Sequence, residues 1–504
     1  MLRRLLLAFL ALATCVAPLS ATWSIVVVNL RTREVGVVGA TCLEGFNLRK
    51  GIAVIVVGEG AAAAQSFVDT SGDNRRLIYF DLKDASGTPA EILAALANLD
   101  AGHETRQYGI VNFEGPPVSF TGTRDGLAAT GVTGQIGDFL YAIQGNVLTG
   151  DQVVLAAEAA FRAKKGDMAE KMMAAMEAAR ALGGDGRCSC DPGRPTSCGV
   201  PPPSFSKSAH VACMVIARMG DTNGGCSAAR GCAEGEYWLD LNVRGDAADP
   251  DPVFTLQGRY DQWKLDRRGR PDGLESRAGG LKALPADGVT ERTVTIELRD
   301  REERSLTHGG ALVEVTTVDG APSLATLGPV LDLGNGRYTF TLKAGTVPGR
   351  DRFRVRVTDV NPVDPADIVT ATLYPYLEIE TFATSLYSSE EQLSAAAGGS
   401  LGLVLNRADK PAAPYLFLAR LVPSQVSDPR RALPRGFGTL LLAQSPFFPA
   451  APLLLDRAGR GEARLEALPG ELVPFVTRRV EFTGYVLDGA PLESTATVGV
   501  EILP

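Results

Sequence analysis

The feature that most constrains the fold is a change of pattern near residue 267. Before it, β-prone runs are interspersed with amphipathic helical stretches, which is typical of sheets covered by helices. After it, short alternating strands separated by turn residues continue to the end of the chain without a convincing helix. We therefore predict a multidomain protein: an α+β layered domain over residues 22–266, a polar linker over 267–285, and two all-β sandwiches over 286–374 and 375–504.

Helix starts are clear in the first domain. Thr88-Pro89-Ala90-Glu91 combines a capping residue, a proline at the first helical position and a capping-box glutamate. Two further helices are predicted over Val153–Lys164 and Met168–Leu182, the second with a methionine face that we interpret as packing rather than a cofactor site. The predicted strands are Ser24–Asn29, Glu34–Ala40, Ile52–Val57, Tyr108–Phe113, Pro117–Thr121, Val211–Ala217 and Tyr237–Val243.

The first 21 residues have the pattern of an export signal. A basic start is followed by an apolar run, Leu5–Ala13, that is too short to span a bilayer, and small residues then lead to Ala21. Cleavage after Ala21 would make Thr22 the first residue of an exported protein. The alternative is lipidation at Cys15, although Thr14 stands where a lipoprotein box normally carries a smaller residue.

A threonine at the N-terminus can carry out a particular kind of catalysis. Its hydroxyl can act as a nucleophile while its own α-amine acts as the general base, so no histidine is needed. The simpler alternative is that Thr22 only begins the first strand.

Composition excludes several other classes of function. A net charge of −8, a pI near 5.3 and the lack of a basic cluster argue against nucleic acid as a partner. No apolar stretch after Ala21 is long enough for a transmembrane segment. The three histidines, His103, His210 and His308, have neither triad nor ligand spacing, so a histidine-based hydrolase or metal enzyme is disfavoured.

Six cysteines form a cluster within residues 188–232, which we interpret as a disulfide-stapled insertion of an exported protein. The candidates are Cys188, Cys190, Cys198, Cys213, Cys226 and Cys232. Cys42 is predicted to be an unpaired, buried residue. A zinc site is the alternative, but the C-x-C spacing is unusual for zinc ligands. The sequence does not decide which of these cysteines pair with one another.

The order of several short motifs resembles a bacterial family of unknown function with an N-terminal-nucleophile (Ntn) hydrolase fold. The pieces are Thr22-Trp23-Ser24-Ile25, Arg106-Gln107, Phe120-Thr121-Gly122, Gln144-Gly145-Asn146-x-Leu148, Gly183-Gly184-Asp185-x-Arg187, Ser208-Ala209, Leu239-Asp240-Leu241-Asn242-Val243 and Asp251-Pro252. The resemblance covers about residues 22–263 and implies an αββα layered domain. Family members commonly begin Met-Thr-Phe-Ser-Ile, so loss of methionine would expose the same threonine, and some carry peptidoglycan-binding modules.

The tail also has resemblances. Ala286-Asp287-Gly288-Val289-Thr290, Gly336-Arg337-Tyr338-Thr339 and Leu342-Lys343-Ala344-Gly345-Thr346 are similar to immunoglobulin-like (Ig-like) repeats of the invasin type. The last segment resembles a β module found at the end of exported bacterial proteins.

In a fold of this kind, the chemistry of a terminal threonine suggests candidate catalytic partners for Thr22. Asn146 would donate to the oxyanion, with Gly145 letting the backbone approach closely. Asp185 would orient the amine or bind a substrate ammonium. The structural alternatives are a turn at Gly145-Asn146 and a helix stop at Gly183 followed by a turn carboxylate.

Three polar residues are candidates for substrate binding. Arg106 could pair with a substrate carboxylate, Gln107 could supply an amide and Thr121 a hydroxyl. A structural salt bridge and strand-edge hydrogen bonds are the alternatives.

The sequence thus predicts an exported amidohydrolase with Thr22 as both nucleophile and base. Its expected substrate is a cell-wall peptide or another small amide, with no cofactor and no metal, and the β-rich tail is expected to contact the cell wall or cell surface. The alternative is a catalytically silent surface or adhesion protein that retains the fold as a binding module.

Overall fold

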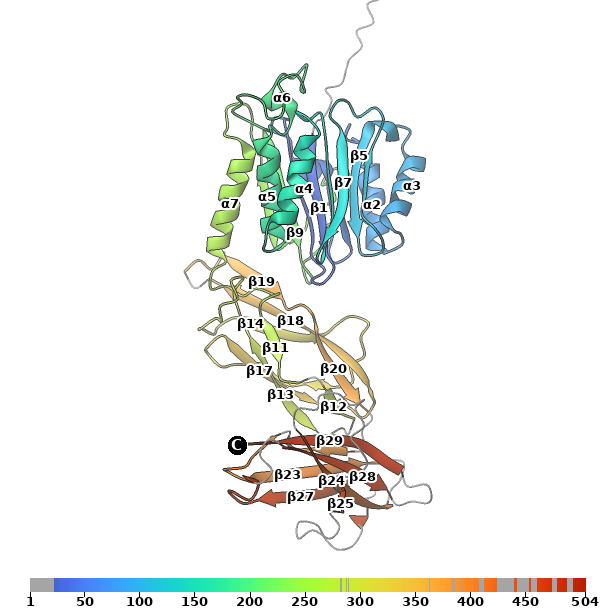
Figure 1. Ribbon diagram of the computed structural model, residues 1–504, viewed down its shortest axis with the longest axis vertical. Coiled ribbons are helices and arrows are strands. Elements are labelled where there is room, and N and C mark those ends of the chain that lie inside the picture. Colours follow the sequence, from blue (N-terminus) through green and yellow to red (C-terminus); the bar gives the residue numbers. More distant parts are fainter. Residues whose placement is uncertain are drawn as a thin grey trace, which may run out of the picture. The chain divides into compact units, whose positions relative to one another are not determined.

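The computed structural model describes residues 22–504, except 282, 287, 289, 362, 383–385, 391, 408–411, 424–438, 442–452, 455–459, 474–477 and 487–492. The predicted signal and Cys15 lie outside the described residues. The chain divides into two compact units (Figure 1). The first comprises the residues up to Ser276 with Leu298–Leu306 and Arg356–Pro375, and the second comprises Arg277–Glu297, Thr307–Val355 and Tyr376–Pro504.

The first unit contains two antiparallel sheets. The larger has the strand order β10-β9-β2-β1-β8-β7 and the smaller has the order β3-β4-β5-β6. The larger sheet consists of β1 (Thr22–Asn29), β2 (Val35–Thr41), β7 (Thr130–Ile136), β8 (Phe139–Asn146), β9 (Val211–Ala217) and β10 (Leu239–Val243). The smaller consists of β3 (Ala53–Val56), β4 (Gly60–Ser66), β5 (Arg106–Asn112) and β6 (Val118–Thr121).

Helices cover the outer face of each sheet, so the layers run helix, sheet, sheet, helix (Figure 1). The larger sheet is covered by α4 (Gln152–Ala163), α5 (Met168–Ala181) and α7 (Pro252–Asp266), and the smaller by α2 (Asp73–Lys83) and α3 (Pro89–Leu99). Three short helices complete the unit: α1 (Leu48–Ile52), η1 (His103–Thr105) and α6 (Gly186–Ser189).

The position of the central strand β1 explains why its sequence is a continuous apolar run. Trp23, Ile25 and Val27 pack with the helices on one face, whereas Val26 and Val28 pack between the sheets. A strand buried on both faces needs a continuous apolar run instead of alternation, and residues 25–28 provide it. The predicted methionine face is also confirmed, because Met172, Met173 and Met176 of α5 are buried in the helix-side core.

Local signals set the helix starts. Thr88 and Glu91 form the predicted capping box at α3, with Thr88 Oγ1 accepting from the Glu91 N–H at 3.3 Å and the Glu91 carboxylate accepting from the Thr88 N–H at 2.8 Å. Asp167 caps α5 in the same way, its side chain accepting from the Glu170 N–H.

The second unit is β-rich and sandwich-like. Two sheets have the orders β11-β13-β17-β15, with β16 on β17, and β12-β20-β18-β14. Their strands are β11 (Arg277–Gly279), β12 (Ala283–Pro285), β13 (Glu291–Glu297), β14 (Leu312–Thr317), β15 (Thr326–Leu327), β16 (Leu331–Asp332), β17 (Arg337–Lys343), β18 (Gly349–Val360) and β20 (Leu377–Phe382). β19 (Ile368–Thr372), which pairs with Arg356–Val360 of β18, is counted with the first unit.

The last residues form two further sheets, ordered β21-β23-β27 and β22-β29-β28-β24-β25, with β26 on β24. Their strands are β21 (Leu386–Ser388), β22 (Gln392–Ser394), β23 (Gly399–Asn406), β24 (Pro414–Pro423), β25 (Thr439–Leu441), β26 (Leu453–Leu454), β27 (Arg460–Ala467), β28 (Arg478–Val486) and β29 (Glu493–Leu503). The prediction of a multidomain chain with an α+β domain followed by β-rich, sandwich-like parts is confirmed. Within the described residues, no helix has the length and apolar character needed to cross a bilayer.

Part of the predicted linker differs from expectation, because residues 270–273 are buried. Arg270 forms ion pairs with Asp359 and with Asp367, the latter at 2.6 Å. Asp272 accepts a bond of 2.7 Å from Arg218, whose Nε also donates to Glu34 at 2.8 Å. Residues 267–276 therefore belong to the packed first unit, although their polar composition is typical of an exposed linker.

Candidate active site

Thr22 lies at the beginning of the central strand and is almost fully buried. Because side chains alternate along a strand, Thr22 shares the face of Ser24, which points toward the second sheet and donates to Gln65 Oε1 at 2.6 Å. Gln65 on β4 also donates from Nε2 to the Thr22 carbonyl oxygen at 3.0 Å. The Thr22 side chain thus lies on the strand face that looks into the space between the two sheets.

A buried network of amide side chains surrounds this end of β1. Gln107 on β5 accepts at Oε1 from Gln65 Nε2 at 2.8 Å and donates from Nε2 to Thr121 Oγ1 and to the Gly145 carbonyl oxygen, both at 2.9 Å. Asn146 Nδ2 donates to the same Gln107 Oε1 at 3.1 Å. The structure therefore brings Gln107, Thr121, Gly145 and Asn146 together beside Thr22.

Asn146 lies directly opposite Thr22 in the register of β1 and β8. Its Oδ1 is buried and has no hydrogen-bond donor. The turn alternative for this segment is wrong, since Gly145 and Asn146 belong to β8 and the left-handed backbone conformation occurs at Val147, with φ of 52°. An unsatisfied buried amide oxygen beside Thr22 is an acceptor that a ligand or an ammonium group can use.

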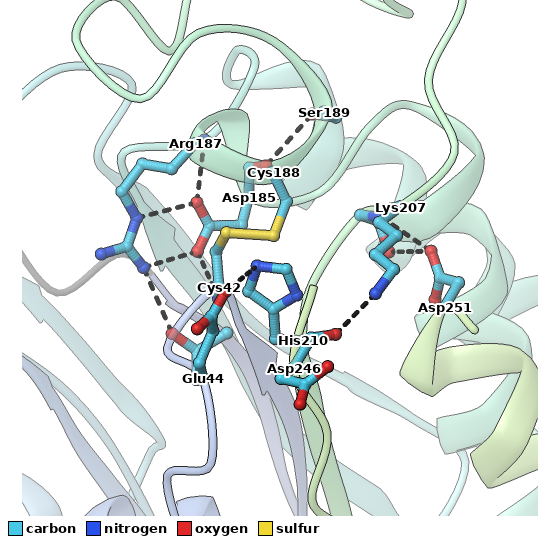
Figure 2. Close-up of a disulfide and its surroundings, with 12 residues drawn as sticks. Cys42, Glu44, Asp185, Arg187, Cys188, Ser189, Lys207, His210, Asp246 and Asp251 are labelled. Atoms are coloured by element: carbon cyan, nitrogen blue, oxygen red, sulfur yellow. Dashed lines mark hydrogen bonds and ion pairs between the residues drawn. A yellow bond between two sulfur atoms is a disulfide. The ribbon is translucent and has the colours of Figure 1, made fainter. Parts of the chain in front are cut away.

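Asp185 lies at the same end of the sheet and is completely buried (Figure 2). Its carboxylate forms an ion pair of 2.8 Å with Arg187 and accepts from the Cys42 N–H at 2.8 Å. Arg187 also reaches Thr41 Oγ1 at 3.4 Å, and Thr41 ends β2, the strand that flanks β1. The negative charge of Asp185 is therefore already balanced by a neighbouring guanidinium.

Arg106 does not join this group. It precedes Gln107 on β5 and points to the opposite face of the strand, where its Nε donates to Asp100 at 2.7 Å. Asp100 therefore already serves as the anion that pairs with Arg106. The pair lowers the pKa of Asp100 to about 2, although burial acts in the opposite direction. The contacts of Arg106 are those of the structural salt bridge considered as the alternative.

The disulfides are Cys42–Cys188, Cys190–Cys198 and Cys226–Cys232. Two predictions are therefore wrong: Cys42 is paired, and Cys213 is a free, buried cysteine of β9. Cys42 is separated from Cys188 by 146 residues, and only the fold brings the end of β2 beside α6. Among the described residues, the zinc alternative has some geometric support, because ligand atoms of Cys42, Cys188 and His210 lie within 4.8 Å of one another (Figure 2). In a disulfide, however, these sulfurs are not the thiolates that zinc requires.

Two titratable groups near the Thr22 end of the sheets are not among the residues predicted from the sequence. Asp125 is buried after β6, and burial raises its pKa to about 6 although the Gly122 N–H, which donates at 3.0 Å, opposes the shift. Arg75 on α2 is also buried. Neither lies in a recognisable motif, although the arginine pair at the start of α2 is visible in the sequence.

A cavity of about 620 Å³ occupies the same end of the domain. Its wall consists of residues 43, 45–47, 50 and 51 after β2, residues 67–70 and 75 after β4, and residues 228 and 244. The loops that leave the two sheets beside Thr22 therefore enclose space for a small molecule.

Two parts of the chain match family models. Residues 22–193 match DUF1028, a family of unknown function. Residues 279–372 match invasin domain 3. The resemblance expected from the sequence is thus confirmed for both parts, and no curated protein matches the chain.

The chain also has weak similarity to several solved structures. A DUF1028 protein from Silicibacter pomeroyi is 18% identical, covers 48% of this chain and 89% of its own length, and has a TM-score of 0.35. The Yersinia pseudotuberculosis adhesin InvE is 18% identical over 46% of this chain and 60% of its own, with a TM-score of 0.17. The Escherichia coli adhesin FdeC is 10% identical over 97% and 99%, with a TM-score of 0.17.

Proposed function

We propose that the protein is an exported amide hydrolase of the Ntn type, with Thr22 as nucleophile and general base. The observation that carries the proposal is the position of Thr22 at the first residue of the central strand, on the face between two sheets and beside an amide network. The layer order of helix, sheet, sheet, helix supports the same fold family.

The chemistry follows from the residues around Thr22. Once cleavage has exposed its amine, Thr22 Oγ1 would attack an amide carbonyl carbon while the amine takes the hydroxyl proton and passes it to the leaving nitrogen. Water would then hydrolyse the resulting ester and regenerate the threonine.

Asn146 serves this reaction in two ways. Its buried Oδ1 is an acceptor for the Thr22 amine, which it would orient, and its Nδ2 carries a second N–H beyond the bond to Gln107 that can stabilise the oxyanion. Gln107 and Gln65 would act as positioning residues that fix the Asn146 amide. Asp185 would add negative charge at this end while Arg187 limits its effect.

Export is supported by three disulfides, which persist in oxidising compartments. Signal removal after Ala21, a cell-wall peptide as substrate and a wall-contacting tail are parts of the same proposal.

The test begins with N-terminal sequencing and intact mass of the protein recovered from its host. A chain beginning at Thr22 is expected, and a chain with a lipidated Cys15 would contradict the mechanism. That protein is then assayed against a panel of small amides, with mass spectrometry to detect an ester at Thr22. Thr22→Ser should keep partial activity and Thr22→Ala should have none, while Thr133→Ala, an exposed threonine of β7, is the matched control. Full hydrolysis by Thr22→Ala would reject the proposal.

A binding function is the second candidate, and the match to invasin domain 3 over residues 279–372 favours it. In that case the amide network is a rigid core that holds a recognition surface. A mature protein that retains residues ahead of Thr22 and binds whole cells or isolated walls would support this alternative.

A further inference from the structure

Two chain segments lead from the surroundings of Thr22 to the wall of the 620 Å³ cavity. Gln65 donates to the Thr22 carbonyl, and Phe67 of the cavity wall follows two residues later on the same segment. Leu43, on the other wall, follows two residues after Thr41, whose strand flanks β1. Since a strand advances about 3.3 Å per residue, the cavity wall begins about 7 Å along the chain from Gln65 and from Thr41, which both lie beside Thr22.

The charge of the wall is unbalanced. Arg75, Lys50 and Arg244 line the cavity, and Asp69 is the single carboxylate among its lining residues. The Asp69 carboxylate is already occupied, because it accepts from Ser71 Oγ at 2.7 Å and from the Asn74 N–H at 3.0 Å. Against the opposing effect of burial, these bonds and the nearby charge of Arg75 lower the pKa of Asp69, so it stays ionised.

Arg75 is the decisive residue because it is buried and forms no ion pair with a described residue, although the charge of Asp69 lies near enough to favour its charged form. It is 5% exposed, its Nη1 donates to the Asp69 carbonyl oxygen at 3.3 Å, and its Nε is buried without an acceptor. Among the ion pairs formed by the described residues, none includes Arg75. Burial also lowers its pKa. A buried guanidinium is costly unless an anion pairs with it, so a ligand that supplies one would gain binding energy here.

The rest of the wall is largely apolar, with Leu43, Phe46, Phe67 and Val68. A ligand that fits should therefore combine one anionic group with an apolar part. Arginine presents parallel N–H donors that match the two oxygens of a carboxylate.

We propose that this cavity binds the carboxylate end of the substrate, with Arg75 as its anion partner, so that Thr22 acts on amides of apolar amino acids that carry a free carboxylate. This proposal rests on the hydrolase function proposed above. It transfers to Arg75 the role that the sequence suggested for Arg106, whose guanidinium is already paired with Asp100.

The test measures binding separately from catalysis. The Thr22→Ala protein is titrated calorimetrically with N-acetyl derivatives of alanine, leucine and phenylalanine, and with the neutral carboxamide of each. At least one free acid should bind, with its carboxamide weaker by about tenfold or more. Arg75→Gln should abolish this difference. Arg76→Gln, which removes the adjacent exposed arginine paired with Asp73, should preserve it.

Folding is checked by the thermal midpoint of each variant. Arg75→Gln should melt no lower than the parent, because it removes a buried unpaired charge. Lys50→Gln, at a less buried position, should weaken the acid about threefold and provides an independent variant. Equal binding of acid and carboxamide, or unchanged affinity in Arg75→Gln, would overturn the proposal, as would no binding by any of the acids.

The two proposals can fail separately. Acid binding that depends on Arg75, in a protein whose Thr22 form hydrolyses nothing, would reject only the hydrolase. Hydrolysis by Thr22 with no preference for a free carboxylate would reject only the role of the cavity.

Discussion

The Cys42–Cys188 disulfide should contribute far more to stability than the two short-range disulfides. It closes a loop with a sequence separation of 146, against 6 for Cys226–Cys232. In the loop-entropy description, cross-links of these lengths reduce the freedom of the unfolded chain by about 5 and about 2 kcal/mol, respectively. Replacing Cys42 and Cys188 together by alanine should therefore cost about 3 kcal/mol more than replacing Cys226 and Cys232.

Urea unfolding followed by tryptophan fluorescence provides the assay. All three tryptophans, Trp23, Trp238 and Trp263, lie in the first unit, so the signal reports on the domain that carries these disulfides. Peptide mapping without reduction should first confirm the pairing. Equal losses of unfolding free energy in the two double variants would refute the reasoning, and so would a larger loss for the short loop.

Three further perturbations test local interactions. Glu34→Ala should lower the unfolding free energy by about 3 kcal/mol in urea denaturation, because Asp272 would be the remaining ion-pair partner of buried Arg218. Thr88→Ala should cost about 1 kcal/mol by loss of the α3 capping box, measured by thermal denaturation. Asp125 has a pKa raised to about 6, so the folded state holds its proton more tightly than the unfolded chain, and its contribution to stability is lost as pH rises through 6. The melting temperature of Asp125→Asn relative to the parent should therefore increase between pH 5 and pH 8.

Each of these has a matched comparison. Asp138→Ala removes the exposed partner of Arg31 and should change stability by less than about 1 kcal/mol. A loss as large as that of Glu34→Ala would contradict the argument from burial. Thr88→Ser should retain most of the cap, so an equal loss in Thr88→Ser and Thr88→Ala would count against capping. For Asp125→Asn, a melting difference that does not vary with pH would show that Asp125 is not the responsible group.

Elements with explicit local signals were predictable from the sequence. The capping box at α3 and the continuous apolar run of β1 both act through neighbours within a few residues, so their effect is visible without the fold. α7 also carries such a signal, Asp251-Pro252, which caps its start, but the sequence analysis used it only as part of the family resemblance.

Other elements carry no local signal of their type. β4 is a run of alanines between Gly60 and Gln65, and alanine is depleted in strands. These small residues are fully buried where the strand packs between neighbouring layers, so tertiary packing sets their conformation. The residue before α2, Gly72, has a left-handed backbone conformation and offers no side-chain cap. The sequence therefore contains no capping signal that would predict the start of α2.

The candidate site was predictable only in part. The sequence indicates Gln107, Thr121 and Asn146 only as separate residues. The structure joins them because the start of β5 and the ends of β6 and β8 lie together. Gln65 and Arg75 could not be identified, because their importance comes from contacts between segments far apart in the chain. The same reason explains the error over Cys42, whose partner is brought beside it by the sheet.

The buried thiol of Cys213 has a consequence for oxidative maturation. The chain from Thr22 onward has seven cysteines, so one sulfur must stay single. The structure places this sulfur within β9, between β2 and β10, and burial raises the pKa of its thiol to about 12. Thiol exchange requires the thiolate, so Cys213 leaves the exchange reaction as soon as the sheet forms. Seven cysteines can form three disulfides in roughly a hundred ways, whereas the six that remain without Cys213 can do so in about fifteen. The sheet would thus prevent mispairing through Cys213, because any disulfide to this residue would leave one of the other six cysteines without its partner.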